Sequence, residues 1–183
     1  MRLFLDRLYA GALLLSAAGF AAIAALVLFQ VVGRLIDRVA RLMGVAPPGL
    51  TVPSLAELGG FLFVAAVALG LAGTFVRGGH VRVSLLTRAL PSRVSRALSA
   101  AVAAVAAGLS LFATWSSWLQ AVDSWTFDSV SFGMLRIPLW LPQGAMTLGL
   151  ALLTVALVDA LVVLLRGGAP SYEVAEAEFG EDA

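Results

Sequence analysis

Two acidic residues lie where a carboxylate could do chemistry, because each borders or interrupts a long apolar segment. Glu57 begins the run ELGGFLFVAAVALGLAG, and Asp159 lies within LLTVALVDALVVLL. A charge in the hydrocarbon costs at least about 2.5 kcal/mol, so such a residue is a candidate for proton or ion transfer. Both acids lie toward one end of their runs, however. We therefore favour structural roles: Glu57 could pair with Arg34, and Asp159 could pair with Arg77 or extend toward the membrane surface.

Other reactive side chains are scarce. The chain has no cysteine and one histidine, His80, which excludes thiol chemistry, iron–sulfur clusters and a bis-histidine haem site. Every basic residue is arginine and the acids gather near the C-terminus, a pattern that concerns membrane topology rather than nucleic acid. We predict no catalytic, substrate-binding or metal-ligating residue, no cofactor in this chain and no enzymatic activity.

The composition places these residues in a membrane. Hydrophobic residues make up 61% of the 183 residues and charged residues 13%, which is far more apolar than a soluble domain. A membrane-spanning helix needs about 20 apolar residues, and four segments qualify: 8–32, 55–76, 97–119 and 141–165. The first run exceeds a signal peptide's apolar region and lacks a cleavage region, so we interpret it as an uncleaved span.

The predicted fold class is therefore an all-α integral membrane protein with four transmembrane helices and amphipathic interfacial helices. We expect one domain, residues 1–168, and an acidic cytoplasmic tail, residues 169–183, that is disordered. Arginines predict the orientation, because they accumulate on the cytoplasmic side. Eight lie on the side of the two termini and four on the other, so both termini are predicted to be cytoplasmic, with outer loops at 33–54 and 120–140.

Three segments are typical of a membrane surface. Residues 34–43 form an amphipathic helix that either lies in the interface or prolongs the first span. The cytoplasmic loop 81–99 is amphipathic, with Pro91 starting a new helical segment, and its arginines could bind anionic phospholipid. The outer loop 120–140 carries aromatic residues that suit anchoring at the interface, and Pro138 and Pro142 bracket the start of the fourth span.

Small residues at helical spacing predict where helices approach closely. They form three ridges, which we expect to pack mainly within this chain, with a larger membrane partner as the alternative: Ala17/Ala21/Ala25, Ala66/Gly70/Thr74 and Ala100/Ala104/Gly108.

Four motifs in a fixed order carry a family resemblance. They are Val32-Gly33-Arg34, the acid-led helix from Ala56-Glu57-Leu58 to Gly70, the turn RGGHVRV at 77–83 followed by Leu90-Pro91, and the segment Ser131–Trp140 with Arg136, Pro138 and Trp140. Over roughly residues 29–150, the chain resembles the small membrane subunit of tripartite ATP-independent periplasmic (TRAP) transporters. Departures include Ser84, where the family usually has an acid or amide, and Leu35 in place of an aromatic residue.

The resemblance implies a function. In such systems a periplasmic binding protein delivers a solute, usually an organic acid, to a large membrane subunit that carries the substrate and sodium sites. The small subunit is a fixed scaffold in the bacterial or archaeal inner membrane, and it could help the binding protein dock. The turn would then direct Arg77, His80 and Arg82 at helix C-termini of this subunit or of the large one.

Three alternatives stay open. A self-contained four-span exporter would need an acid near the middle of a span. A membrane-bound redox or lipid-modifying enzyme is disfavoured by the absence of cysteine and the single histidine. A structural four-span protein outside any transport system would be recognised by its gene neighbourhood, which would lack a large permease and a binding protein.

Overall fold

The structure is a computed structural model, and it describes residues 2–79 and 91–174. Four helices account for most of this part of the chain: α1 (Arg2–Leu42), α2 (Leu55–Val76), α4 (Ser92–Thr126) and α5 (Trp140–Leu165). Each is long and apolar enough to cross a membrane. The predicted all-α class with four spans is confirmed.

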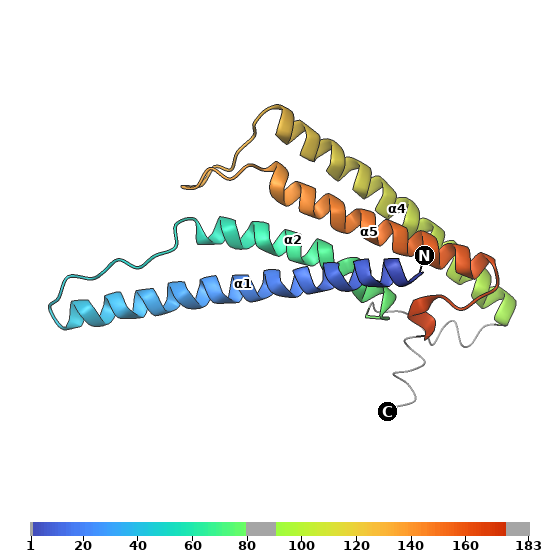
Figure 1. The fold of residues 1–183 in the computed structure, drawn as a ribbon, viewed down its shortest axis with the longest axis horizontal. Coiled ribbons are helices and arrows are strands. Elements are labelled where there is room, and N and C mark those ends of the chain that lie inside the picture. The colour runs from blue at the N-terminus through green and yellow to red at the C-terminus, as the bar shows by residue number, and fades with distance from the viewer. Residues whose placement is uncertain (1, 80–90, 175–183) are drawn as a thin grey trace, which may run out of the picture.

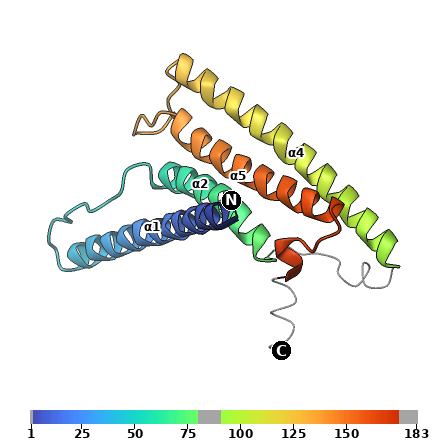
Figure 2. The same cartoon turned by 45° about the vertical axis from the view of Figure 1, so that its right-hand side comes forward.

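The helices lie side by side in a single layer, in the order α1–α2–α5–α4 (Figure 1). The pair α1/α2 and the pair α5/α4 are closest near the end where α1 begins and α5 ends, here called the terminal end. They separate toward the opposite end, here called the loop end, which carries the connections 43–54 and 127–139 (Figures 1 and 2). The molecule is therefore an open layer rather than a closed four-helix bundle.

The helix α1 is longer than the predicted first span. The amphipathic segment 34–43 does not form a separate interfacial helix but continues α1 to Leu42, giving a helix of 41 residues and about 60 Å. The chain from Gln30 to Leu42 contains one glycine, Gly33, and no proline, and one glycine costs less than the bonds of an uninterrupted helix. A Schellman turn ends α1, with Gly44 at φ 70° and the Val45 N–H donating to the carbonyl of Ala40.

The connections are correspondingly shorter than the predicted outer loops. The first comprises residues 43–54 instead of 33–54, and the second comprises residues 127–139 instead of 120–140 because α4 continues to Thr126. At its other end α4 begins at Ser92 directly after Pro91, as the proline predicts.

Close backbone approach through small residues packs α2 between its two neighbours. On the α1 side, a Cβ built on Gly70 would lie 2.8 Å from the Ser16 hydroxyl oxygen, and one built on Gly19 would lie 2.9 Å from the Ala66 Cβ. On the α5 side, a Cβ on Gly149 would overlap the backbone of Ala68. Toward the terminal end, residues of α1, α2 and α5 meet in one buried cluster: Tyr9, Ala12, Ala72, Leu152 and Ala156.

The three small-residue ridges behave differently. The α2 ridge packs within the chain as expected, since Ala66 and Gly70 are buried against α1. The α1 ridge of Ala17, Ala21 and Ala25 is exposed. On α4, Ala104 and Gly108 are also exposed. The spacing of small residues thus identified close-packing surfaces but could not tell which of them face another helix of this chain.

The start of the predicted tail is packed rather than disordered. Pro170 is fully buried, and Tyr172 is 4% exposed with its ring centroid 5.3 Å from that of Phe75 at the end of α2. The apolar side chains of these residues explain the difference, because they cover the terminal end of α2. The acidic residues after position 174 lie outside the described residues.

The contact at Gly149 predicts a position-specific effect on stability. We expect Gly149→Ala to destabilise the helix layer by about 1–3 kcal/mol, because the added methyl group overlaps the Ala68 backbone, which cannot move as a side chain can. The matched control is Gly108→Ala, where a Cβ meets nothing within 4 Å and alanine favours the helix. Thermal unfolding of the detergent-purified protein measures both. Equal melting temperatures for the two variants would contradict this packing.

Candidate functional site

Five hydroxyl side chains of α4 and α5 form hydrogen bonds between these two helices. The Ser110 hydroxyl lies 2.8 Å from that of Thr154, and the Ser117 hydroxyl lies 2.7 Å from that of Thr147. Thr114 joins the first pair, with its hydroxyl 3.1 Å from that of Thr154. Such bonds satisfy polar groups that lipid cannot solvate, so they hold the helices together rather than line a path for solute.

A second polar contact attaches the connection 43–54 to α1. The backbone N–H of Val52 donates to Gln30 Oε1 at 2.7 Å, and that of Gly49 donates to Asp37 Oδ1 at 3.0 Å. Between these two, a Cβ on Gly33 would overlap the Leu50 carbonyl oxygen. Gly33 of the Val-Gly-Arg motif therefore lets the returning chain lie against the helix, while Arg34 next to it is exposed.

The acid-led start of α2 holds the connection between α4 and α5. The backbone N–H of Gly133 donates to Glu57 Oε1 at 3.2 Å, and that of Met134 donates to Ser54 Oγ at 2.9 Å. The Glu57 carboxylate occupies the space that a Cβ on Gly133 would take. The other carboxylate oxygen, Oε2, is buried without a hydrogen-bond partner among the described residues. Glu57 thus joins two connections that are far apart in the sequence.

The segment held by Glu57 is a short hairpin, residues 129–139. Val130 and Pro138 form an isolated antiparallel bridge, and the buried Ser131 hydroxyl donates to the Leu135 carbonyl at 2.8 Å. The Ile137 N–H in turn donates to the Ser131 hydroxyl at 3.1 Å. After the hairpin, α5 begins with Trp140, whose ring centroid lies 4.8 Å from that of Trp125 in an edge-on arrangement.

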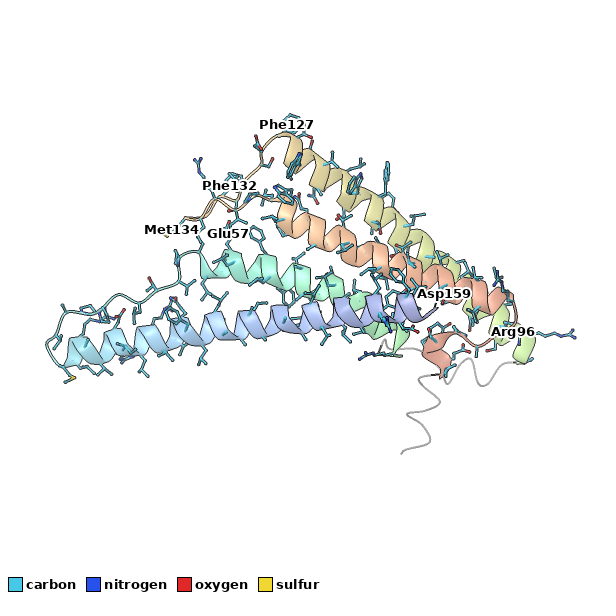
Figure 3. All side chains as sticks on the ribbon, in the orientation of Figure 1. Glu57, Arg96, Phe127, Phe132, Met134 and Asp159 are labelled. Carbon is cyan, nitrogen blue, oxygen red and sulfur yellow. The ribbon has the colours of Figure 1, made fainter. Side chains whose placement is uncertain are left out.

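The tip of this hairpin is exposed although its backbone is held. Phe132 is 103% exposed and Met134 is 84% exposed, and Arg136 is also exposed. Figure 3 shows Phe132 and Met134 at the tip, next to Glu57 at the start of α2. Large apolar side chains on a fixed backbone are typical of a protein contact surface. The hairpin tip is therefore the candidate functional site.

The terminal end holds the other predicted residues. Arg77 follows α2 and is exposed, and Gly78 after it has φ 72°, which provides the tight turn expected from the two glycines. His80 and Arg82 lie outside the described residues. Asp159 lies on α5 toward the terminal end (Figure 3).

The two predicted ion pairs do not form in the part of the chain that the structure describes. Neither Glu57 with Arg34 nor Asp159 with Arg77 comes within 4.0 Å. Glu57 instead accepts the Gly133 N–H, so its partner is a backbone group. No cluster of three or more potential metal ligands occurs among the described residues.

Sequence reasoning missed the residues that complete the site, Ser54 and Gly133. A signal existed in Ser54-Leu55-Ala56-Glu57, which has the spacing of a helix capping box. In the structure Ser54 adopts a left-handed conformation with φ 51° and makes no side-chain cap. Both side chains of the motif bind the hairpin instead, which only the three-dimensional arrangement could show.

Comparison with known families gives one match. The family described as tripartite ATP-independent periplasmic transporters, DctQ component, matches residues 23–167, which is more than three quarters of the chain. The matched region includes α2, α4, α5 and the hairpin with its partners Ser54 and Glu57. No curated protein gives a significant match to the chain.

The hairpin contact predicts different effects for two substitutions of Glu57. Glu57→Gln retains a carbonyl oxygen that can accept the Gly133 N–H, whereas Glu57→Ala removes the acceptor. We expect Glu57→Ala to raise amide exchange at Gly133 and Met134 by about tenfold or more, and Glu57→Gln to raise it much less. Hydrogen–deuterium exchange of the detergent-solubilised protein measures this. Thr126→Ala, which removes only a hydrogen bond within α4, is the control. Unchanged exchange in Glu57→Ala would disprove the contact.

Proposed function

The chain belongs to the DctQ family of TRAP transporter components, and from this premise we propose that it is the fixed scaffold of its transporter. Family membership is the observation that carries the proposal. In this role the chain sits in the inner membrane of a bacterium or archaeon and braces a large, sodium-coupled subunit. That subunit takes up an organic acid delivered by a periplasmic binding protein.

The form of the four spans supports a scaffold role. Transporters commonly build their substrate and ion sites from discontinuous helices near the middle of the membrane. Here all four spans are uninterrupted helices within the described residues. The hydroxyl groups of Ser110 and Ser117 on α4 are paired with those of Thr154 and Thr147 on α5. These features suit a part that keeps its shape, with the substrate and sodium sites in the large subunit.

The hairpin tip suits docking of the binding protein. It presents Phe132 and Met134 on a backbone held by Glu57 and Ser54, so little ordering entropy is lost on contact. In the proposed orientation both termini are cytoplasmic, and the hairpin therefore faces the periplasm, where the binding protein is. The exposed Arg136 beside the tip offers a polar contact.

The orientation can be tested with single cysteines, because the chain has none of its own. We expect cysteine at position 132 to react with a membrane-impermeant maleimide on spheroplasts that retain an intact inner membrane. Cysteine at position 92 should react only after the membrane is opened, since it lies at the opposite end of α4. The reverse pattern would invert the proposed topology.

The scaffold role predicts which transport parameters change on substitution. Glu57→Gln and Asp159→Asn each remove a charge near a span with little change of shape. We expect both to leave the apparent solute affinity and the sodium dependence within about twofold of wild type, because neither residue would contact solute or sodium. Assembly or maximal rate is expected to fall instead.

The measurement is solute uptake into vesicles that contain the assembled complex, across a range of sodium and solute concentrations. Complex without the small subunit is the control and should be inactive. A shift of tenfold or more in sodium dependence from either substitution, with normal assembly, would place this chain in the coupling machinery and contradict the scaffold role.

A further inference from the structure

The exposed face of α4 carries three polar side chains toward the loop end. Ser116, Gln120 and Asp123 follow one another at helical spacings of four and three, and all three are exposed. They are here called the α4 polar stripe. Its first two residues, with Met146 and Leu150 of α5, line a shallow groove of about 580 Å³ between the helices. A second hollow of about 490 Å³ also borders Gln120 and is lined by Asp123 and Phe127.

Hydrogen bonds to α5 define the depth of this stripe. Ser117, next to Ser116, bonds to Thr147, which lies about two turns inside the apolar helix α5. In the amide orientation that pairs donors with acceptors, Gln143 donates to the Gln120 carbonyl at 3.1 Å. Gln120 is therefore level with the first turn of α5 and Ser116 is deeper. Lipid tails cannot satisfy the Ser116 hydroxyl at the deeper level.

The other edge of the layer provides an internal comparison. Between Leu8 and Val32, α1 has two polar side chains besides Tyr9, namely Ser16 and Gln30, and both are buried against other parts of the chain. The exposed face of α1 over this range is composed of apolar and small residues, such as Leu14, Ala21 and Leu28. The exposed surface of α4 is also largely apolar, with side chains such as Phe112 and Trp115, but unlike that of α1 it includes the polar stripe.

We propose that the α4 polar stripe, with the groove beside it, is the surface on which the large membrane subunit packs. The proposal rests on the function proposed above, which provides such a partner. The stripe would be matched by a helix of the large subunit that presents hydrogen-bond donors to Gln120 and Ser116. Near the loop end, the same helix would present a basic or amide side chain to Asp123. The exposed small residues Ala104 and Gly108 on the same helix allow close backbone approach farther along.

Site-specific crosslinking tests which edge the large subunit covers. A photoreactive amino acid is placed at position 116 or 120 on α4, or at position 21 or 28 on α1 as matched exposed controls, and the chain is co-expressed with its tagged large subunit. We expect crosslinks to the large subunit from the α4 positions, several-fold more than from the α1 positions. Crosslinks mainly from α1, or from α4 to a second copy of this chain or to lipid only, would overturn the proposal.

The direction in which a substitution changes co-purification distinguishes a stripe that contacts a protein partner from one that contacts lipid. Replacing an amide that faces lipid with an apolar group is neutral or favourable, whereas replacing one that bonds to a partner weakens the complex. We expect Gln120→Leu to lower co-purification with the tagged large subunit by about threefold, and Ser116→Trp to lower it further, while Ala21→Trp leaves it unchanged. Wild-type co-purification in both Gln120→Leu and Ser116→Trp would reject the surface.

The wild-type chain distinguishes failure of this inference from failure of the proposed function. If the wild-type chain co-purifies with the large subunit but the α4 variants have no effect, only the assigned surface is wrong. If the wild-type chain neither co-purifies with the large subunit nor is needed for uptake, the proposed function fails, and this inference fails with it.

Discussion

The close contact between Gly149 of α5 and the backbone of Ala68 of α2 is the joint on which the helix layer depends. Within a membrane, helices gain little from burying apolar side chains, because lipid is equally apolar, so association relies on close packing and on hydrogen bonds. The helix α2 has a neighbour on each side, and its contact with α5 is the main helix-to-helix contact that joins the pair α1/α2 to the pair α5/α4 within the described residues. Glycine at this position lets two backbones meet directly.

Two further contacts keep the pairs from rotating about this joint. At the terminal end, Tyr9, Ala72 and Leu152 meet in the buried cluster. At the loop end, where the pairs separate, the hairpin reaches across and is held by Glu57 and Ser54 (Figure 1). Three contacts spread along the length of the layer fix its angle. The acid at the start of α2 therefore has a mechanical role, and its position at a helix N-terminus also favours its charge.

The sequence was sufficient to predict the four spans, because apolar runs of bilayer length carry most of the information in a membrane protein. The motif from Arg77 and the acid-led helix at Glu57 were sufficient to indicate the family that the comparison shows.

The sequence could not show which side chains bond to each other between different helices and connections. The Ser54–Glu57 pattern predicts a helix cap, yet both side chains bind a hairpin about 76 residues away, a choice set by how α2 and α5 diverge. The end of α4 was misjudged, since this helix continues beyond the apolar segment into polar sequence that still favours helix. For α1, the sequence left two alternatives open for residues 34–43, and the structure shows the one in which they prolong the first span.

The open layer also explains why a chain of this kind is suited to be a subunit. Within the apolar windows of the four spans, between 11% and 33% of residues are buried inside the chain, so even the central helices leave much of their surface uncovered. A closed bundle would direct its polar and small residues inward and present a uniform apolar surface to lipid. A single layer instead has two broad faces and two edges, and each must match whatever covers it. Polar groups within the chain are satisfied at three places. Hydroxyl groups pair between α4 and α5, Gln30 and Asp37 hold the connection 43–54 to α1, and the Glu57 carboxylate accepts a hydrogen bond from the hairpin. The polar groups that remain exposed on α4 then mark the surface where this internal pairing ends, and a second protein is the natural source of the missing partners.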